Sequence, residues 1–445
     1  AQAELSAHAT PRGTHEPSSC AQAANGAEPA SRSTPPPPAP ATSAHAGIPL
    51  LQALDAKLLA ALRNAHIKLV SADYLRAGKL QGFARRQDLE RRQREQPDER
   101  IFLSPDEAAD ALTRGNRSVG ALTYGWTTPD ASDVDAVYLR ALVRFLKSPL
   151  GSHIVGVFVD FMSLAQYKRT ADEDVAFGAA LGVMAHLYAS ATGTTVVRHK
   201  ALPPRPAALD GELVLLGGDS LERASVEAAL GAYGAAVERV AHEPEVKGGR
   251  WRVRGAAHAA AEAAAAALAT AEAREAAGLA GVEACFPFYN GRPYDARGWT
   301  TLESAVATEA VARAAFYPKL AAALEALPPK LVEIDGEAGP AVARESDAEA
   351  AQRKAEGAGP RIERIRASIG AATFTGKGDK DRVLFMYGEF MVDIGNAMVD
   401  SGEVVGGTYE GARNAAGQAE GWGTYRYATG NVYEGEWKAG KQEGR

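Results

Sequence analysis

Along this chain, runs of consecutive apolar residues alternate with segments whose apolar residues recur at helical spacing. Two near-continuous apolar runs, Val119 to Trp126 and Ile154 to Phe161, are typical of strands buried on both faces. Val134 to Lys147, between these runs, and Thr170 to Ser190, after them, have the spacing of helices. Two shorter strands are expected at Thr194 to Arg198 and Lys330 to Ile334. This alternation predicts an α/β fold with a parallel sheet and helices on both faces.

A different order of elements interrupts this pattern at residues 204–284. The segment predicts the order βαββα, which resembles an incomplete ferredoxin-like or RNA-recognition-motif unit inserted into the larger domain. Its expected elements are Glu212 to Leu216, Leu221 to Tyr233, Val237 to His242, Trp251 to Arg254 and Ala256 to Leu279. RNA-recognition motifs stack bases on aromatic residues of two central strands, and only Trp251 is available for that purpose here. We therefore interpret the insert as structural.

Three further segments are expected to lie outside the α/β domain and the insert. Residues 1–47 are rich in Ala, Pro, Ser and Thr and poor in branched apolar residues, which predicts a disordered tail. Residues 48–118 and 336–402 are expected to be helical regions. Helices of the second region are expected over Val342 to Lys354, Ile362 to Ile369 and Arg382 to Val399.

Composition and charge exclude several classes of protein. A net charge of -6 and a pI near 5.9 disfavour binding of nucleic acid. Cys20 and Cys285 are too few for a disulfide scaffold, and the nine His residues are scattered, so we expect no metal site. The low cysteine content fits a reducing, cytoplasmic setting best. No membrane span is expected, since no apolar run approaches about 20 residues. We interpret the chain, which starts at Ala1 without Met, as a fragment of a longer protein.

A repeat occupies the last segment, residues 403–445. Tyr409-Glu410-Gly411 recurs 24 residues later as Tyr433-Glu434-Gly435, among regularly placed glycines. The second copy closely resembles a MORN repeat, whereas Arg413 replaces the expected tryptophan in the first. The resemblance implies an array of β-hairpins that binds protein partners or self-associates. Contact with membrane phospholipids is the weaker alternative, because five basic residues balance five acidic ones from Tyr409 to Arg445.

Three motifs of the α/β domain resemble the fungal heterokaryon-incompatibility (HET) domain. Gly120 to Trp126 resembles its opening strand, Val159 to Gln166 its "WIDxxCINQ" strand end, and Arg297 to Glu303 its "RxWTxQE" helix start. The family has Cys, Asn and Gln where this chain has Ser163, Ala165 and Leu302. The resemblance assigns residues 119–203 and 285–335 to one domain, divided by the insert.

HET domains are similar in fold to Toll/interleukin-1 receptor (TIR) domains, so the resemblance implies a flavodoxin-like sheet. In NAD-cleaving TIR domains the catalytic glutamate follows a tryptophan by four residues, the spacing of Trp299 and Glu303. Glu303 would then stabilise the oxocarbenium-like ribose as the N-glycosidic bond of NAD breaks, with NAD as substrate and no cofactor required. The positional assignments are Arg297 for the pyrophosphate, Trp126 or Trp299 for a ring, and Asp160 or Gln166 for a ribose hydroxyl.

The same residues also have purely structural interpretations. Thr300-x-x-Glu303 is the pattern of a capping box, and Asp160 can cap the turn after its strand. The chain contains no GxGxxG, P-loop, GxSxG or HExxH motif. Two hypotheses follow: an intracellular signalling protein that binds and hydrolyses a nicotinamide dinucleotide, localised or oligomerised by MORN repeats, or a non-catalytic scaffold that binds partners through both parts.

Overall fold

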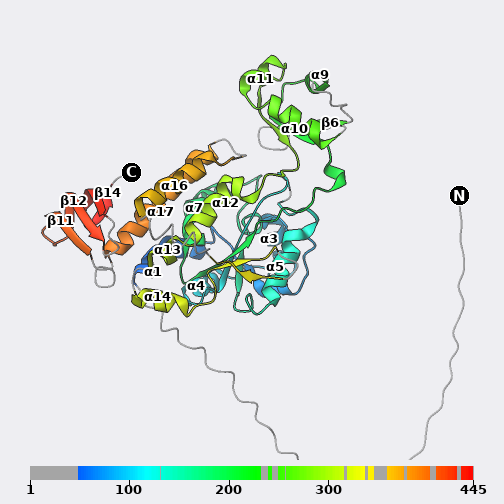
Figure 1. Ribbon diagram of the computed structural model, residues 1–445. Coiled ribbons are helices and arrows are strands. Elements are labelled where there is room, and N and C mark those ends of the chain that lie inside the picture. Colours follow the sequence, from blue (N-terminus) through cyan, green and yellow to red (C-terminus); the bar gives the residue numbers. More distant parts are fainter. Residues whose placement is uncertain are drawn as a thin grey trace, which may run out of the picture. The chain divides into compact units, whose positions relative to one another are not determined.

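The computed structural model, shown as a ribbon in Figure 1, describes most of the chain after residue 48. The described residues are 49–130, 132–231, 239–242, 249–255, 257–314, 318–335, 339–344, 358–374, 378–400, 407–427 and 432–443. The tail expected over residues 1–47 lies outside them. Ser43–Arg445 forms one compact unit.

A six-stranded mixed sheet forms the centre of the α/β domain, in the order β1-β3-β2-β4-β9-β10. Its strands are β1 (Val70–Ser71), β2 (Val119–Tyr124), β3 (Gly156–Phe158), β4 (Thr194–His199), β9 (Leu331–Glu333) and β10 (Ala341–Val342). The four inner strands are parallel, as expected, whereas the two edge strands pair antiparallel. The α/β class is therefore confirmed, but the sheet is mixed rather than purely parallel.

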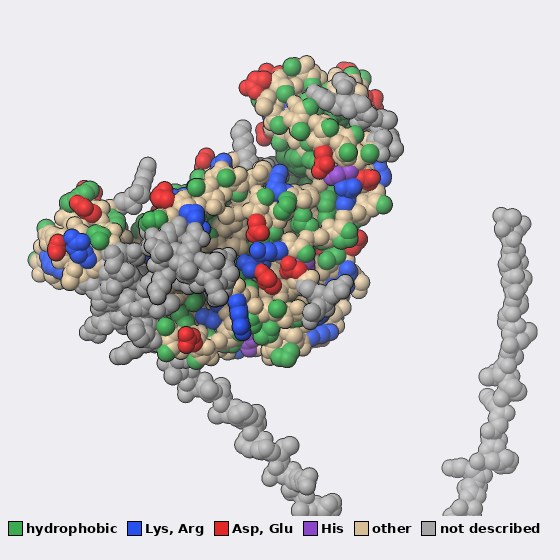
Figure 2. Space-filling model, in the orientation of Figure 1, with side chains coloured by type: hydrophobic (Ala, Val, Ile, Leu, Met, Phe, Trp, Pro, Cys, Tyr) green, Lys and Arg blue, Asp and Glu red, His purple; other side chains and the backbone are tan. Residues whose placement is uncertain are grey.

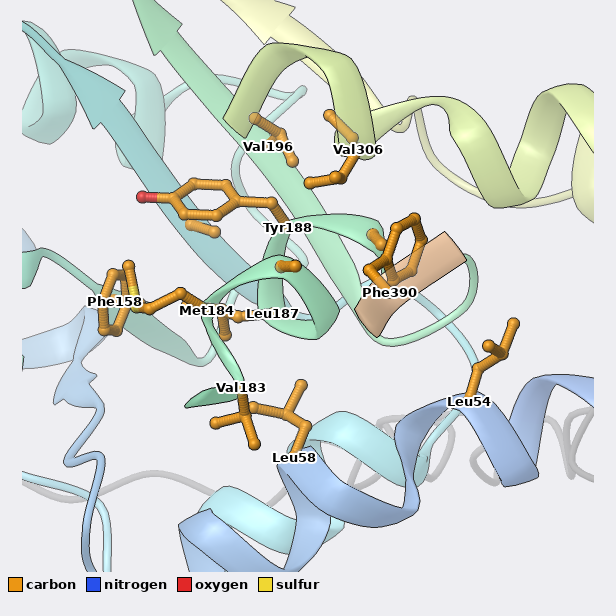
Figure 3. Close-up of a cluster of buried hydrophobic side chains, with 14 of the residues drawn as sticks. Leu54, Leu58, Phe158, Val183, Met184, Leu187, Tyr188, Val196, Val306 and Phe390 are labelled. Atoms are coloured by element: carbon orange, nitrogen blue, oxygen red, sulfur yellow. The ribbon is translucent and has the colours of Figure 1, made fainter. Parts of the chain in front are cut away.

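Successive residues of a strand point to opposite sides of the sheet, and β2 and β3 are buried at every position. Both faces of the sheet are therefore apolar, and helices cover both. Ala121 belongs to one hydrophobic core and its neighbour Leu122 to another. The first core is completed chiefly by α1 (Pro49–Arg63), α4 (Pro105–Thr113), α8 (Met184–Ala189), α12 (Gly298–Ala307) and α17 (Asp379–Asp400). The second is completed by α2 (Ala72–Arg76), α3 (Arg86–Glu95) and α5 (Val137–Lys147). Figure 3 shows side chains of α1, α8, α12 and α17 meeting in the first core.

Two expected elements differ from the prediction: a helix is divided and a strand is shortened. The helix expected over residues 170–190 is two helices, α7 (Ala171–Gly182) and α8, because Val183 leaves helical geometry at φ -114° and ψ 7°. The strand expected over 154–161 is shorter, because α6 (Asp160–Ser163) begins directly after it. Asp160 thus lies at the junction of a parallel strand and a helix.

The insert is a second sheet with one more strand than expected. Its elements are β5 (Glu212–Gly217), α9 (Arg223–Gly231), β6 (Arg239–His242), β7 (Arg250–Arg254), α10 (His258–Ala267), α11 (Ala271–Ala276) and β8 (Val282–Pro287). All neighbouring strands pair antiparallel in the order β6-β7-β5-β8. The order of elements is βαββαβ, with the second helical segment divided into α10 and α11, so β8 completes the unit past residue 284, where we expected it to end.

After β8, α12, α13 (Glu309–Ala314) and α14 (Pro318–Glu325) precede the return to β9. The helix expected from Val342 is wrong at its start, because Val342 is in strand β10, and residues 345–357 lie outside the described residues. Helices α16 (Ala358–Ala371) and α17 confirm the other two expected helices and extend beyond them.

The C-terminal repeat forms a third sheet of four antiparallel strands. They are β11 (Gly407–Arg413), β12 (Ala419–Tyr427), β13 (Val432–Lys438) and β14 (Lys441–Glu443), paired in chain order. Gly411, Gly423 and Gly435 lie side by side across this sheet. A Cβ atom on Gly423 would lie 2.2 Å from the hydroxyl oxygen of Tyr409, and one on Gly435 would lie 2.5 Å from that of Tyr433. The Tyr-Glu-Gly repeat therefore places each tyrosine ring over glycines.

Candidate functional site

Asp160 is held by aromatic residues at the carboxyl ends of the parallel strands. The Tyr124 hydroxyl donates to its Oδ1 and the Trp126 indole N–H to its Oδ2, both at 2.8 Å. The backbone N–H of Phe161 also donates to Oδ1, at 2.7 Å. Burial raises the pKa of Asp160 despite these three donors. The structure thus brings Trp126 and Asp160 into direct contact at the sheet edge where α/β proteins bind ligands.

Gln166 lies next to Asp160 but is bonded to the backbone. Its side-chain N–H donates to the carbonyl oxygens of Asp160 and Leu164, at 3.1 and 2.9 Å. The Gln87 side chain accepts from the backbone N–H of Gln166 at 3.1 Å. These bonds fix the turn that follows α6.

Glu303 lies on α12 and its carboxyl group faces β2. The Thr123 hydroxyl donates to its Oε2, and the Tyr294 hydroxyl lies 2.6 Å from the Thr123 oxygen and 3.0 Å from that of Ser304. The residue is only 8% exposed. Burial raises the pKa of Glu303 well above its usual value, and the negative charge of Asp160 adds to the effect. The surroundings of Glu303 therefore favour the protonated form of its carboxyl group more than water does.

The capping box expected at Thr300 and Glu303 is not formed. The helix begins at Gly298 with Arg297 as N-cap, so Thr300 lies inside the first turn. Its hydroxyl donates to the carbonyl oxygen of Tyr294 at 2.5 Å, and the Glu303 carboxyl accepts from Thr123 across the helix–sheet interface. The bond between Glu303 and Thr123 thus takes the place of the capping bond between Glu303 and Thr300.

Arg297 binds the backbone of this chain. It donates to the carbonyl oxygens of Arg292 (2.8 Å), Trp126 (2.6 Å) and Asn290 (2.8 Å). A Cβ atom on Gly125 would lie 2.8 Å from its Cζ, so this glycine leaves room for the guanidinium group. Burial lowers the pKa of Arg297 to about 10. The side chain fastens the loop before α12 to the end of β2.

Trp299 contacts the C-terminal helices. Its indole N–H donates to Asp379 Oδ2 of α17 at 3.2 Å, and its ring packs on the first core. Phe374 covers the preceding turn so closely that a Cβ atom on Gly298 would lie 1.8 Å from its ring. Of the six candidate residues, the structure brings Trp126, Asp160 and Gln166 together, places Glu303 and Arg297 beside them, and directs Trp299 to α17.

The sequence did not indicate a site role for Thr123, Tyr124 or Tyr294, which supply hydroxyl groups of this cluster. The available signal is a threonine and a tyrosine inside an otherwise apolar strand, because buried hydroxyl groups require partners. A cavity of about 620 Å³ lies elsewhere, lined by residues 62–69 and 93–108, and includes none of the candidate residues.

Other classes of site find no support among the described residues. The structure has no group of three His, Cys, Asp or Glu side chains in these parts that could hold a metal ion. No helix in the same residues is long and apolar enough to cross a membrane. Figure 2 shows Lys and Arg interspersed with Asp and Glu on the face in view, without a large field of one sign.

Comparison of the chain with known protein families, curated proteins and solved structures gives no match.

Proposed function

We propose that this chain is a protein-interaction scaffold, in which a HET/TIR-like domain of flavodoxin-like topology carries a MORN-type sheet. The order of its parallel strands supports the topology: numbered along the chain, β3-β2-β4-β9 is 2-1-3-4, the beginning of the flavodoxin-like order. The antiparallel order of the insert, 2-3-1-4 by the same count, fits a ferredoxin-like unit. The glycine row of the third sheet fits stacked β-hairpins.

The hydrogen bonds of Arg297 to the backbone are the main support for the functional part of this proposal. Three of its five N–H groups donate to backbone carbonyl oxygens and the residue is 7% exposed, so the guanidinium group holds the loop that precedes α12 and offers little surface to a pyrophosphate. Glu303 agrees with this conclusion, because burial raises its pKa and so disfavours the carboxylate form that would stabilise an oxocarbenium charge. The α/β domain then has a structural role, and the C-terminal sheet binds the partner.

Nicotinamide release tests the scaffold proposal directly. The intact chain and its Glu303→Gln variant are incubated with NAD and with NADP, at concentrations that permit self-association, and nucleotide binding is measured by calorimetry. We expect neither binding nor release. Release that disappears in a folded Glu303→Gln variant would overturn the scaffold proposal and make Glu303 a catalytic residue.

A second function, cleavage of a nicotinamide dinucleotide, is favoured by the proximity of Asp160 and Glu303. The two carboxyl groups interact electrostatically at the carboxyl ends of β2 and β3, beside the Trp126 indole. Pairs of acids with shifted pKa values mark many catalytic sites. This function requires the carboxylate form of Glu303, whose pKa is raised by burial, so activity would increase with pH.

A further inference from the structure

The C-terminal sheet has two faces of different character. On one face the Trp437 ring packs against Tyr409, Tyr425 and Tyr433, with centroid distances of 5.1, 5.9 and 5.3 Å. The opposite side, called the outer face here, is mostly polar and charged: Trp422 and Val432 are its exposed large apolar residues, and Arg426, Lys438 and Lys441 lie toward its margins. Its central residues are Glu410, Trp422, Thr424, Glu434, Glu436 and Glu443.

Trp422 is exposed at the centre of this outer face. Two-thirds of its surface, 66%, is accessible, whereas Trp437 on the other face is 2% exposed. Strand pairing places Glu436 directly beside Trp422, and Thr424 in the next row lies between Glu410 and Glu434. An indole in this position exposes apolar area and a π-face, with carboxylates as its nearest charged neighbours.

The outer face also pairs like charges. Glu436 lies directly opposite Glu443 on the neighbouring strand, an arrangement that destabilises a sheet. Lys438 offsets this weakly: its Nζ lies 3.6 Å from Glu443 Oε1, and both side chains are mostly exposed. The exposed indole and the opposed carboxylates are both unfavourable in the free chain, and a cation placed between them would relieve both.

We propose that the outer face binds an arginine- or lysine-rich segment of a partner protein, with a basic side chain stacked on Trp422 and paired with Glu436. This inference rests on the proposed scaffold function, for which it names the partner's chemistry. A cation over an indole face is attracted by the ring quadrupole, and a neighbouring carboxylate adds a charge-assisted hydrogen bond. The carboxylates around Trp422 repel an anionic membrane surface, which favours a basic protein segment over a lipid partner.

Fluorescence anisotropy of a labelled peptide that alternates arginine with alanine tests the proposal on the intact chain. We expect saturable binding that weakens with added salt, and no binding of the counterpart that alternates glutamate with alanine. Trp422→Ser and Glu436→Gln should each weaken arginine-peptide binding about fivefold or more. Both side chains are solvent-exposed, so the variants should fold; near-UV circular dichroism checks this.

Matched variants on another surface serve as controls. Phe385 on α17 is 67% exposed and Glu389 on the same helix is also exposed, so Phe385→Ser and Glu389→Gln remove an equivalent aromatic and an equivalent charge. Neither should change the affinity. Equal binding by the Trp422→Ser variant, absence of arginine-peptide binding, or preferential binding of phosphatidylserine vesicles would each overturn the inference. Nicotinamide release would instead contradict the scaffold proposal, so the two failures are distinguishable.

Discussion

Glu303 and Glu309 lie on consecutive helices, and their buried carboxyl groups differ in the charge of their partners. Glu303 accepts from the neutral Thr123 hydroxyl, whereas Glu309 pairs with the guanidinium groups of Arg313 at 2.7 Å and Arg361 at 2.8 Å. Burial raises the pKa of Glu303. Burial alone would raise the pKa of Glu309 too, but the two guanidinium groups outweigh it and lower that pKa. The two glutamates should therefore affect stability at opposite ends of the pH scale.

Replacing Glu303 with Gln should stabilise the protein at alkaline pH. The folded wild type keeps a proton on Glu303 above the ordinary glutamate pKa, while the unfolded chain loses it. The free energy of unfolding therefore falls with rising pH through this window, by up to about 1.4 kcal/mol per pH unit, and Gln removes that fall. Urea unfolding at pH 5 and pH 8 measures the effect. An equal difference between variant and wild type at both pH values would contradict the raised pKa.

Replacing Glu309 with Gln should destabilise the protein by about 3–5 kcal/mol at neutral pH, because it leaves two guanidinium groups without their buried counter-charge. The lowered pKa means that the wild type has this stabilisation above the ordinary glutamate pKa and loses it as pH falls through the folded value. Glu363→Gln on α16 removes an exposed partner of Arg366 and should change stability by less than about 0.5 kcal/mol. Similar losses in both variants would argue against the buried triad.

Arg297→Lys should cost about 2–4 kcal/mol of stability, since an ammonium group cannot reach three separate carbonyl oxygens. Arg91→Lys is the control, because Arg91 has 62% of its side chain exposed and pairs only with Asp88 among the ion pairs of the described residues. Thermal unfolding of both variants provides the comparison. A variant at position 297 with wild-type stability and reduced nucleotide affinity would instead assign Arg297 to a ligand site.

Gly423→Ala should loosen the C-terminal sheet, because the new methyl group would lie 2.2 Å from the Tyr409 hydroxyl oxygen. Overpacking of this kind costs about 1–3 kcal/mol. Hydrogen exchange should accelerate in β11, β12 and β13 and remain unchanged in the parallel strands. Thr424→Ala, one residue along on the outer face, is the control. Equal exchange in both variants would show that the tyrosine rings do not require the glycine row.

Hydrophobic periodicity was sufficient to predict the inner strands and α5, because the burial pattern of each can be read from its own short segment of sequence. It could not predict β8, whose exposure pattern lacks a buried run and which acquires its place by pairing with β5. The edge strands β1 and β10 were not predicted either, because two residues are too short a segment to show a periodic pattern. Local signals thus define the buried strands, and long-range pairing defines the sheet edges.

The candidate site was predictable as a set of residues but not as a set of contacts. Asp160 after a buried strand and Trp126 at the end of another follow from the sequence, since parallel strands bring their carboxyl ends together. The bond from Thr123 to Glu303 joins positions 180 residues apart. The local capping box was the stronger expectation from the sequence, and only tertiary packing shows which partner Glu303 takes.

The first and last strands of the insert are neighbours, and this has an evolutionary consequence. Leu213 of β5 and Pro287 of β8 are pairing partners, so the chain enters and leaves the unit at adjacent points. The parallel strands on either side, β4 and β9, still pair directly with each other. A module with adjoining ends can be acquired or lost by recombination without disturbing its host sheet, so the α/β domain is expected to occur in an uninterrupted form as well.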